Sequence, residues 1–145
     1  MSETFKTGGG SCPSLGRMKF GYAIFYVDDV EKTVAFYERA FGLARKVVVG
    51  DEFGELDTGS TSLAFAARAH VETLLPIPVQ SSGATHPPAP VEIALVTDDV
   101  ARAFQTAVKA GAAAVAAPAP KPWGQTVAYV RDLNGFLVEL CTPVG

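Results

Sequence analysis

The chain has 145 residues, of which 48% are hydrophobic and 19% are charged, as is usual for globular proteins. Its net charge of −3 and isoelectric point near 5.3 argue against nucleic-acid binding, which needs a surface rich in Lys and Arg. No apolar run approaches the roughly 18 residues of a membrane span, and no secretory signal is visible, so we expect a cytoplasmic protein.

The first half of the chain predicts a flexible arm over residues 1–17 and then a folded module over residues 18–75. An apolar strand runs from Lys19 to Val27, and Asp28 or Asp29 follows it as the cap of an amphipathic helix. Short strands punctuated by glycine complete the module. They are expected at residues 44–49, 53–57 and 62–67.

The second half repeats this plan after a proline-rich linker loop over residues 76–90. Here Asp98 or Asp99 is expected to cap the helix, and the second module extends over residues 91–145. The expected strands are 91–96, 113–117, 127–131 and 136–141, with a helix at 101–110. Each module is therefore predicted to be βαβββ.

The two halves form a direct repeat. Tyr22–Phe41 reads YAIFYVDDVEKTVAFYERAF, Val91–Ala110 reads VEIALVTDDVARAFQTAVKA, and Asp28 and Asp98 are 98 − 28 = 70 positions apart. A repeat that fills half the chain indicates a duplicated fold. A residue in one half can therefore be compared with its twin in the other.

Three segments resemble the vicinal oxygen chelate superfamily, which includes glyoxalase I, bleomycin-resistance proteins, extradiol dioxygenases and fosfomycin-resistance enzymes. They are YAIFYVDDVEKTVAFYERAFGL (22–43), VEIALVTDDVARA (91–103) and WGQTVAYVRDLNGFLVEL (123–140), with Leu133 where the family usually has Pro. The resemblance implies an α+β fold in which tandem βαβββ modules with curved mixed sheets form a cavity. It also implies a homodimer.

In metal-dependent members of this superfamily, four cavity-facing positions carry His, Glu or Gln. The resemblance places those positions on Tyr22, Ala64, Glu92 and Glu139. None is a histidine and Ala64 has no donor, so we expect no catalytic transition metal and no other cofactor. A divalent metal held by Glu92 and Glu139 is the alternative. The two histidines of the chain, His70 and His86, are interpreted as surface loop residues. The two cysteines, Cys12 and Cys141, do not have the spacing of a metal site or a redox pair.

Glu92 and Glu139 are expected to share the cavity, and two neighbouring carboxylates repel, so one should have a raised pKa. A cation, a water bridge or a partner such as Arg131 would also relieve the repulsion. The aromatic side chains of Tyr22, Tyr129 and Trp123 are candidates for stacking on a flat ligand, although a purely structural role is open for each.

The resemblance implies a glyoxalase/bleomycin-resistance-like protein that binds or sequesters a small organic ligand, and the charge of the two acids favours a cationic ligand. The ligand-binding set is Tyr22, Ala64, Glu92, Trp123, Tyr129 and Glu139. The alternative is an enzyme, a metal-dependent lyase, isomerase or dioxygenase, with Glu139 and Glu92 as catalytic or metal-binding groups, or a metal-free acid–base catalyst. A third hypothesis is a domain that serves association alone. Nucleic acid and membrane are not expected as partners.

Overall fold

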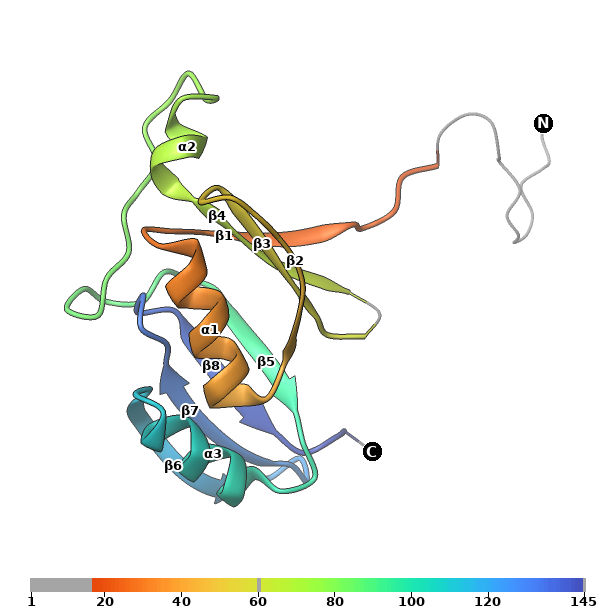
Figure 1. Ribbon diagram of the computed structural model, residues 1–145. Helices are drawn as coiled ribbons and strands as arrows, with labels where there is room; N and C mark the ends of the chain where they lie inside the picture. The colour runs from red at the N-terminus through yellow and green to blue at the C-terminus, as the bar shows by residue number, and fades with distance from the viewer. Residues whose placement is uncertain (1–16, 60, 145) are drawn as a thin grey trace.

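The computed structural model describes residues 17–59 and 61–144, which form two modules of four strands each (Figure 1). The strand order of the first sheet is β1 (Tyr22–Val27), β4 (Ser62–Ala67), β3 (Phe53–Asp57) and β2 (Ala44–Val49). That of the second sheet is β5 (Glu92–Val96), β8 (Leu137–Cys141), β7 (Thr126–Arg131) and β6 (Ala113–Pro120), so the same topology occurs twice. In each sheet the first strand pairs parallel with the fourth and the other pairs are antiparallel. The predicted α+β fold of tandem βαβββ modules with mixed sheets is confirmed.

In the first module, β1 is followed by a helix whose cap was predicted. The Asp29 side chain accepts from Lys32 N at 2.9 Å, and Gly42 ends the helix in the left-handed conformation with φ of 70°. The elements are β1 (Tyr22–Val27), α1 (Val30–Phe41), β2 (Ala44–Val49), β3 (Phe53–Asp57), β4 (Ser62–Ala67) and the short α2 (Arg68–Glu72).

In the second module, the Asp99 side chain caps the helix by accepting from Arg102 N at 3.0 Å. The strand predicted at 113–117 is longer than expected and extends to Pro120. The elements are β5 (Glu92–Val96), α3 (Val100–Lys109), β6 (Ala113–Pro120), β7 (Thr126–Arg131) and β8 (Leu137–Cys141).

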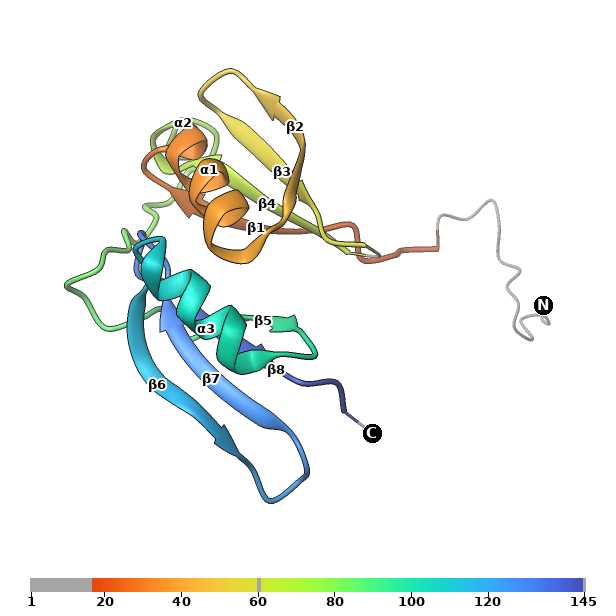
Figure 2. The same ribbon diagram turned by 60° about the horizontal axis from the view of Figure 1, so that its bottom comes forward.

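The helices α1 and α3 lie between the two sheets. Figure 2 shows α1 against the inner side of the first sheet and α3 against the inner side of the second, and the two helices also contact each other. The order of layers is therefore sheet, helix, helix, sheet. The outer faces of the two sheets consequently point away from each other.

A buried polar network joins the modules at this helical layer. Tyr37 on α1 donates its hydroxyl to Asp132 at 2.5 Å, and Asn134 donates its side-chain amide to Thr33 at 3.0 Å. All four residues are buried, and the ring of Phe25 packs edge-on against Phe136 beside them at 5.1 Å. The turn between β7 and β8 is thus fastened to α1 by polar contacts and to β1 by an apolar contact.

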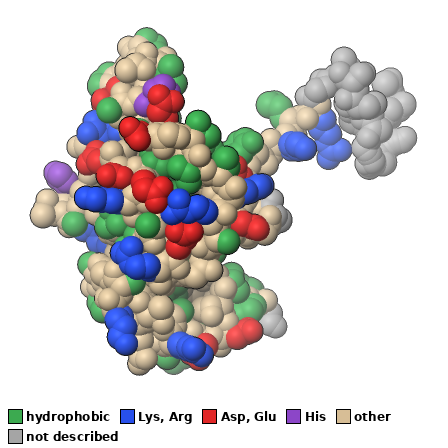
Figure 3. Space-filling view, in the orientation of Figure 1, with side chains coloured by type: hydrophobic (Ala, Val, Ile, Leu, Met, Phe, Trp, Pro, Cys, Tyr) green, Lys and Arg blue, Asp and Glu red, His purple; other side chains and the backbone are tan. Residues whose placement is uncertain are grey.

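The first module also carries mixed charge on its surface. Arg45 on β2 binds both Glu31 and Glu38 of α1, each at 2.9 Å. In the view of Figure 3, Lys and Arg side chains alternate with Asp and Glu over this part of the molecule. This face therefore has no concentration of charge of one sign.

Several details differ from the sequence prediction. His70 lies on α2, a helix that was not predicted, rather than in a loop. The first strand begins at Tyr22 instead of Lys19. The arm predicted over residues 1–17, with Cys12, lies outside the described residues except for Arg17. Within residues 17–59 and 61–144, no helix combines the length and apolarity needed to cross a bilayer.

Candidate functional site

The outer face of the second sheet carries a carboxyl pair. Strand alternation turns Ile93 inward, where it is 8% exposed, and leaves its neighbour Glu92 exposed on the outside. Glu139 on the adjacent β8 pairs in register with Ala94 on one side and Tyr129 of β7 on the other, so all three share one face. We call this surface, made of Glu92, Ala94, Tyr129 and Glu139, the acid face.

The two carboxyl groups of the acid face influence each other's ionisation. The pKa of Glu92 is raised to about 7, first by its hydrogen bond to Glu139, then by partial burial and by the charge of Glu139. Partial burial and the two acids also raise the pKa of Tyr129. Two carboxylates at short range repel each other, so Glu92 keeps its proton to a higher pH than an isolated carboxyl group would.

Arg131 is not the partner of these acids, contrary to the alternative considered from the sequence. Its guanidinium donates to the carbonyl oxygens of Gly83, Ala84 and His86, at 3.2, 3.3 and 2.6 Å, and to that of Gly135 at 2.9 Å. Arg131 therefore fastens the proline-rich linker to the second module. The repulsion within the carboxyl pair is instead reflected in the raised pKa of Glu92.

The outer face of the first sheet has different chemistry. Tyr22 and Ile24 are 56% and 46% exposed there, and Tyr26 lies on the same face. Ala64 pairs with Ile24 and is fully buried, so it offers only backbone and a methyl group. We call this surface, with Tyr22, Ile24, Tyr26 and Ala64, the tyrosine face.

The tyrosine face also contains an acid that the sequence analysis missed. Glu55 on β3 pairs with Ala64, is only 7% exposed, accepts a hydrogen bond from the Ser62 hydroxyl, and lies 3.5 Å from Lys46 Nζ. Its twin is Tyr129, because both are the cross-strand neighbours of the fourth-strand residues Ala64 and Glu139. Extending the repeat comparison to the third strands would have found it.

The six predicted ligand-binding residues are therefore divided between separate surfaces. Tyr22 and Ala64 lie on the tyrosine face, whereas Glu92, Tyr129 and Glu139 lie on the acid face, on the opposite side of the helices. Trp123 lies in the turn between β6 and β7, is 65% exposed, and donates to the Gln125 side chain at 2.7 Å. One chain does not bring the predicted set together.

The donors of the acid face do not fit a transition-metal site. Within one chain it supplies only two carboxyl groups, and the phenol of Tyr22 is on the other face. His70 lies on α2 beside Glu52 and His86 lies in the linker, so neither adds an imidazole. Residues 17–59 and 61–144 contain no group of three or more His, Cys, Asp or Glu that could hold a metal ion. Imidazole and carboxylate together are the usual ligands of such ions.

Comparisons with known proteins agree with this fold. The sequence-family model of the Glyoxalase/Bleomycin resistance protein/Dioxygenase superfamily matches residues 19–140 of the chain. No curated protein matches the chain significantly.

Solved structures with the same fold include a glyoxalase-related enzyme from Fulvimarina pelagi, which is 21% identical with a TM-score of 0.75 over 89% of this chain and 94% of that one. A glyoxalase/bleomycin resistance protein/dioxygenase from Nocardioides is 17% identical, with a TM-score of 0.69 over 88% and 85% of the two chains. A family enzyme from Burkholderia phytofirmans PsJN is 22% identical, with a TM-score of 0.69 over 84% and 96%. At these identities the likeness extends to the fold alone.

Proposed function

Because the chain belongs to the Glyoxalase/Bleomycin resistance protein/Dioxygenase superfamily, we propose that it binds and sequesters a small organic cation on the acid face, without a catalytic transition metal. The observation that carries this proposal is the placement of Glu92 and Glu139 on one face of the second sheet, where their interaction raises the pKa of Glu92. A cation with N–H donors can replace the proton of Glu92, since it satisfies both carboxylates at once. Tyr129 beside the pair supplies an aromatic surface for the organic part.

The pH dependence follows from the same exchange. Below pH 7 the ligand must displace a proton from the pair, whereas above pH 7 it meets two carboxylates that already repel each other. Affinity for a cation should therefore rise as pH rises from 6 to 8. A neutral ligand has no reason to follow this profile.

A second copy of the chain would enclose this ligand, and we propose a homodimer in which the tyrosine face of one copy covers the acid face of the other. Both faces are open in one chain because the helices lie between the sheets. Exposed Tyr22 and Ile24 give the tyrosine face an apolar surface suited to burial. Sedimentation measurements of the wild type and of Ile24→Lys test this, and a wild type that stays monomeric at every concentration refutes it.

The binding proposal is tested with a matched pair of probes, benzamidine and benzamide, in calorimetric titrations at pH 6 and pH 8. Benzamidine carries the charge and the paired N–H donors, and benzamide is nearly its neutral isostere. We expect benzamidine to bind more tightly, to gain at pH 8, and to lose about tenfold in affinity in Glu92→Gln or Glu139→Gln, as loss of a charge-assisted contact implies. Glu72→Gln, on α2, is the control. Equal affinity for the two probes would contradict the proposal.

The placement of Glu92 beside Glu139 also favours a second candidate, a proton-transfer enzyme. A carboxyl whose pKa is about 7 is divided between its acid and base forms at neutral pH, which suits general acid–base catalysis by Glu92 with Glu139 as its partner. Elemental analysis of the purified protein, with a glyoxalase assay in the presence and absence of divalent ions, distinguishes the candidates. Turnover without metal supports the acid–base enzyme, turnover with stoichiometric metal supports the metal-dependent lyase, and no turnover in either condition supports sequestration.

A further inference from the structure

A cleft of about 980 Å³ opens between the two modules and follows β5, an edge strand of the second sheet. Every residue of this strand lines it: Glu92, Ile93, Ala94, Leu95 and Val96. Successive side chains of a strand point to opposite faces, so a cavity that meets all of them reaches around the free edge of the strand. The cleft is therefore continuous with the acid face, to which Glu92 and Ala94 belong.

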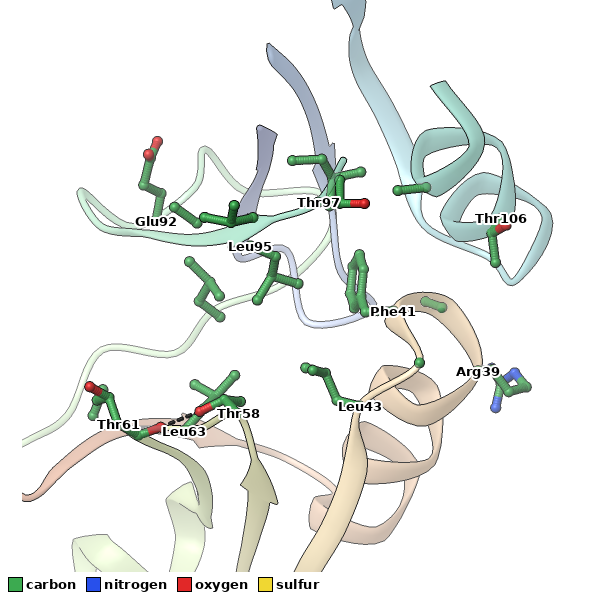
Figure 4. Close-up of a pocket in the computed structure, with 18 of the residues that line it drawn as sticks. Arg39, Phe41, Leu43, Thr58, Thr61, Leu63, Glu92, Leu95, Thr97 and Thr106 are labelled. Carbon is green, nitrogen blue, oxygen red and sulfur yellow. Dashed lines mark hydrogen bonds between the residues drawn. The ribbon is translucent and has the colours of Figure 1, made fainter. Parts of the chain in front are cut away.

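The part of the cleft on the inner side of β5 is apolar and comes from both modules. In Figure 4, Phe41, Leu43 and Leu63 of the first module and Leu95 of the second converge on one gap. Leu63 is 7% exposed, whereas the other three are only partly buried. These partly exposed side chains would lose more contact with water if an apolar chain occupied the gap.

The acid face and the apolar gap are separated only by the width of β5. Figure 4 shows the Glu92 side chain on the opposite side of this strand from Leu95. On that side Glu92 interacts with Glu139, so a cation is the complementary head group. A strand occupies about 4.8 Å in a sheet, so a flexible alkyl chain of roughly eight carbon atoms is long enough to pass around its edge.

The other charged groups of the lining do not compete with Glu92 for such a ligand. Arg39 lies over the ring of Phe36 at 5.7 Å and is at the far end of the cleft from Glu92 in Figure 4. Arg102 is in the first turn of α3, and Asp99 uses its carboxylate to cap that helix. Of the two acids that line the cleft, Glu92 is therefore the one available to a ligand.

We infer that the ligand of the acid face is an amphipathic cation, with an ammonium or amidinium head and a flexible apolar tail. The head binds Glu92 and Glu139. The tail passes around the edge of β5 into the gap lined by Phe41, Leu43 and Leu95. This inference rests on the proposed function and adds the apolar half of the ligand to it. Each methylene that the cleft removes from water should strengthen binding by roughly three- to fourfold.

The test compares n-butylamine, n-octylamine and 1-octanol in calorimetric titrations at pH 8, below the concentrations at which the amines aggregate. We expect one octylamine per chain, bound at least about tenfold more tightly than butylamine and than octanol. Glu92→Gln should weaken both amines by a similar factor, about tenfold. Leu43→Gln should weaken octylamine by roughly tenfold and leave butylamine unchanged. The matched control is Leu74→Gln, because Leu74 is 66% exposed and lies outside the lining.

The outcomes separate this inference from the proposed function. Equal affinities of the two amines, both weakened by Glu92→Gln, would overturn the inference and leave the proposed function standing. Amines that do not bind, or that bind Glu92→Gln as tightly as the wild type, would overturn both. A preference for octylamine that survives in Leu43→Gln and in Leu95→Gln would place the tail outside the cleft and refute the inference. Cooperative thermal unfolding of each variant confirms that the titrations report on folded protein.

Discussion

The buried hydrogen bond between Tyr37 and Asp132 gives a quantitative test of how the modules are joined. Tyr37→Phe removes only the hydroxyl, because both rings have the same shape. The Tyr37 side chain is fully buried and Asp132 is 3% exposed, so no water replaces the lost donor at 2.5 Å from the carboxylate. Asp132 keeps the backbone N–H groups of Asn134 and Phe136 at its other oxygen. Loss of the hydrogen bond from the Tyr37 hydroxyl to Asp132 is therefore the only change that the substitution makes.

A hydrogen bond to a charged group contributes about 1.5–3 kcal/mol to the free energy of unfolding. In a chain of this length, that loss corresponds to a fall in Tm of about 6–12 °C. Chemical denaturation at pH 7 measures the free energy, and calorimetry measures Tm. The control is Tyr26→Phe on the tyrosine face, which is expected to change stability by less than about 0.5 kcal/mol.

The pH dependence of this variant has a definite sign. Burial raises the pKa of Asp132, while the bond from Tyr37 and backbone N–H groups act to lower it. Without Tyr37 the pKa rises further, so the buried carboxyl accepts a proton at a higher pH in the variant. The stability difference between wild type and Tyr37→Phe should therefore narrow as pH falls from 7 towards 4. A variant as stable as the wild type at pH 7 would show that this bond does not hold the modules together.

Three further predictions concern other parts of the molecule. Gly54→Ala should destabilise the protein by about 1–3 kcal/mol in denaturant titrations, because the added Cβ would lie 2.8 Å from Val34 Cγ2 of α1. An unchanged free energy of unfolding would mean that α1 can shift on the sheet without cost. The pKa of Glu92 is raised to about 7 in the folded protein, so the wild type should lose stability relative to Glu92→Gln as pH rises from 5 to 8. Parallel curves of Tm against pH for the two proteins would contradict this. Arg131→Gln should speed limited proteolysis within the linker, because it releases the carbonyl groups of Gly83, Ala84 and His86. The control variant Arg102→Gln should not. Equal cleavage rates in the two variants would show that Arg131 does not fasten the linker.

The local features of the fold were predictable because each depends on a few neighbouring residues. Asp29 and Asp99 cap their helices as expected, since a carboxylate beside free N–H groups needs no tertiary information. The repeat then predicted the shared topology of the two sheets, because a duplicated pattern builds a duplicated module. The outward positions of Tyr22, Glu92 and Glu139 follow from strand alternation and from the resemblance.

The contacts between modules were not predictable in the same way. Tyr37 reads as an ordinary apolar residue of a helix face, and its hydroxyl acquires a role only beside Asp132, 95 positions later. Arg131 was considered as a partner of the acids, but the linker carbonyls are closer to its guanidinium once the proline-rich loop folds back. The cleft that residues of both modules line, among them Leu63 and Leu95, likewise depends on how the two modules are placed.

The twin positions explain why unlike faces should meet in the proposed homodimer. On the first strands, Tyr22 of one module corresponds to Glu92 of the other, and on the third strands Glu55 corresponds to Tyr129. At each of these two pairs of twin positions, one module therefore carries an acid and the other a phenol. Two acid faces placed together would bring four carboxyl groups into one space, at a large electrostatic cost. An acid face against a tyrosine face instead places phenols opposite carboxyl groups, where each O–H can donate a hydrogen bond, and we infer that this difference selects the pairing.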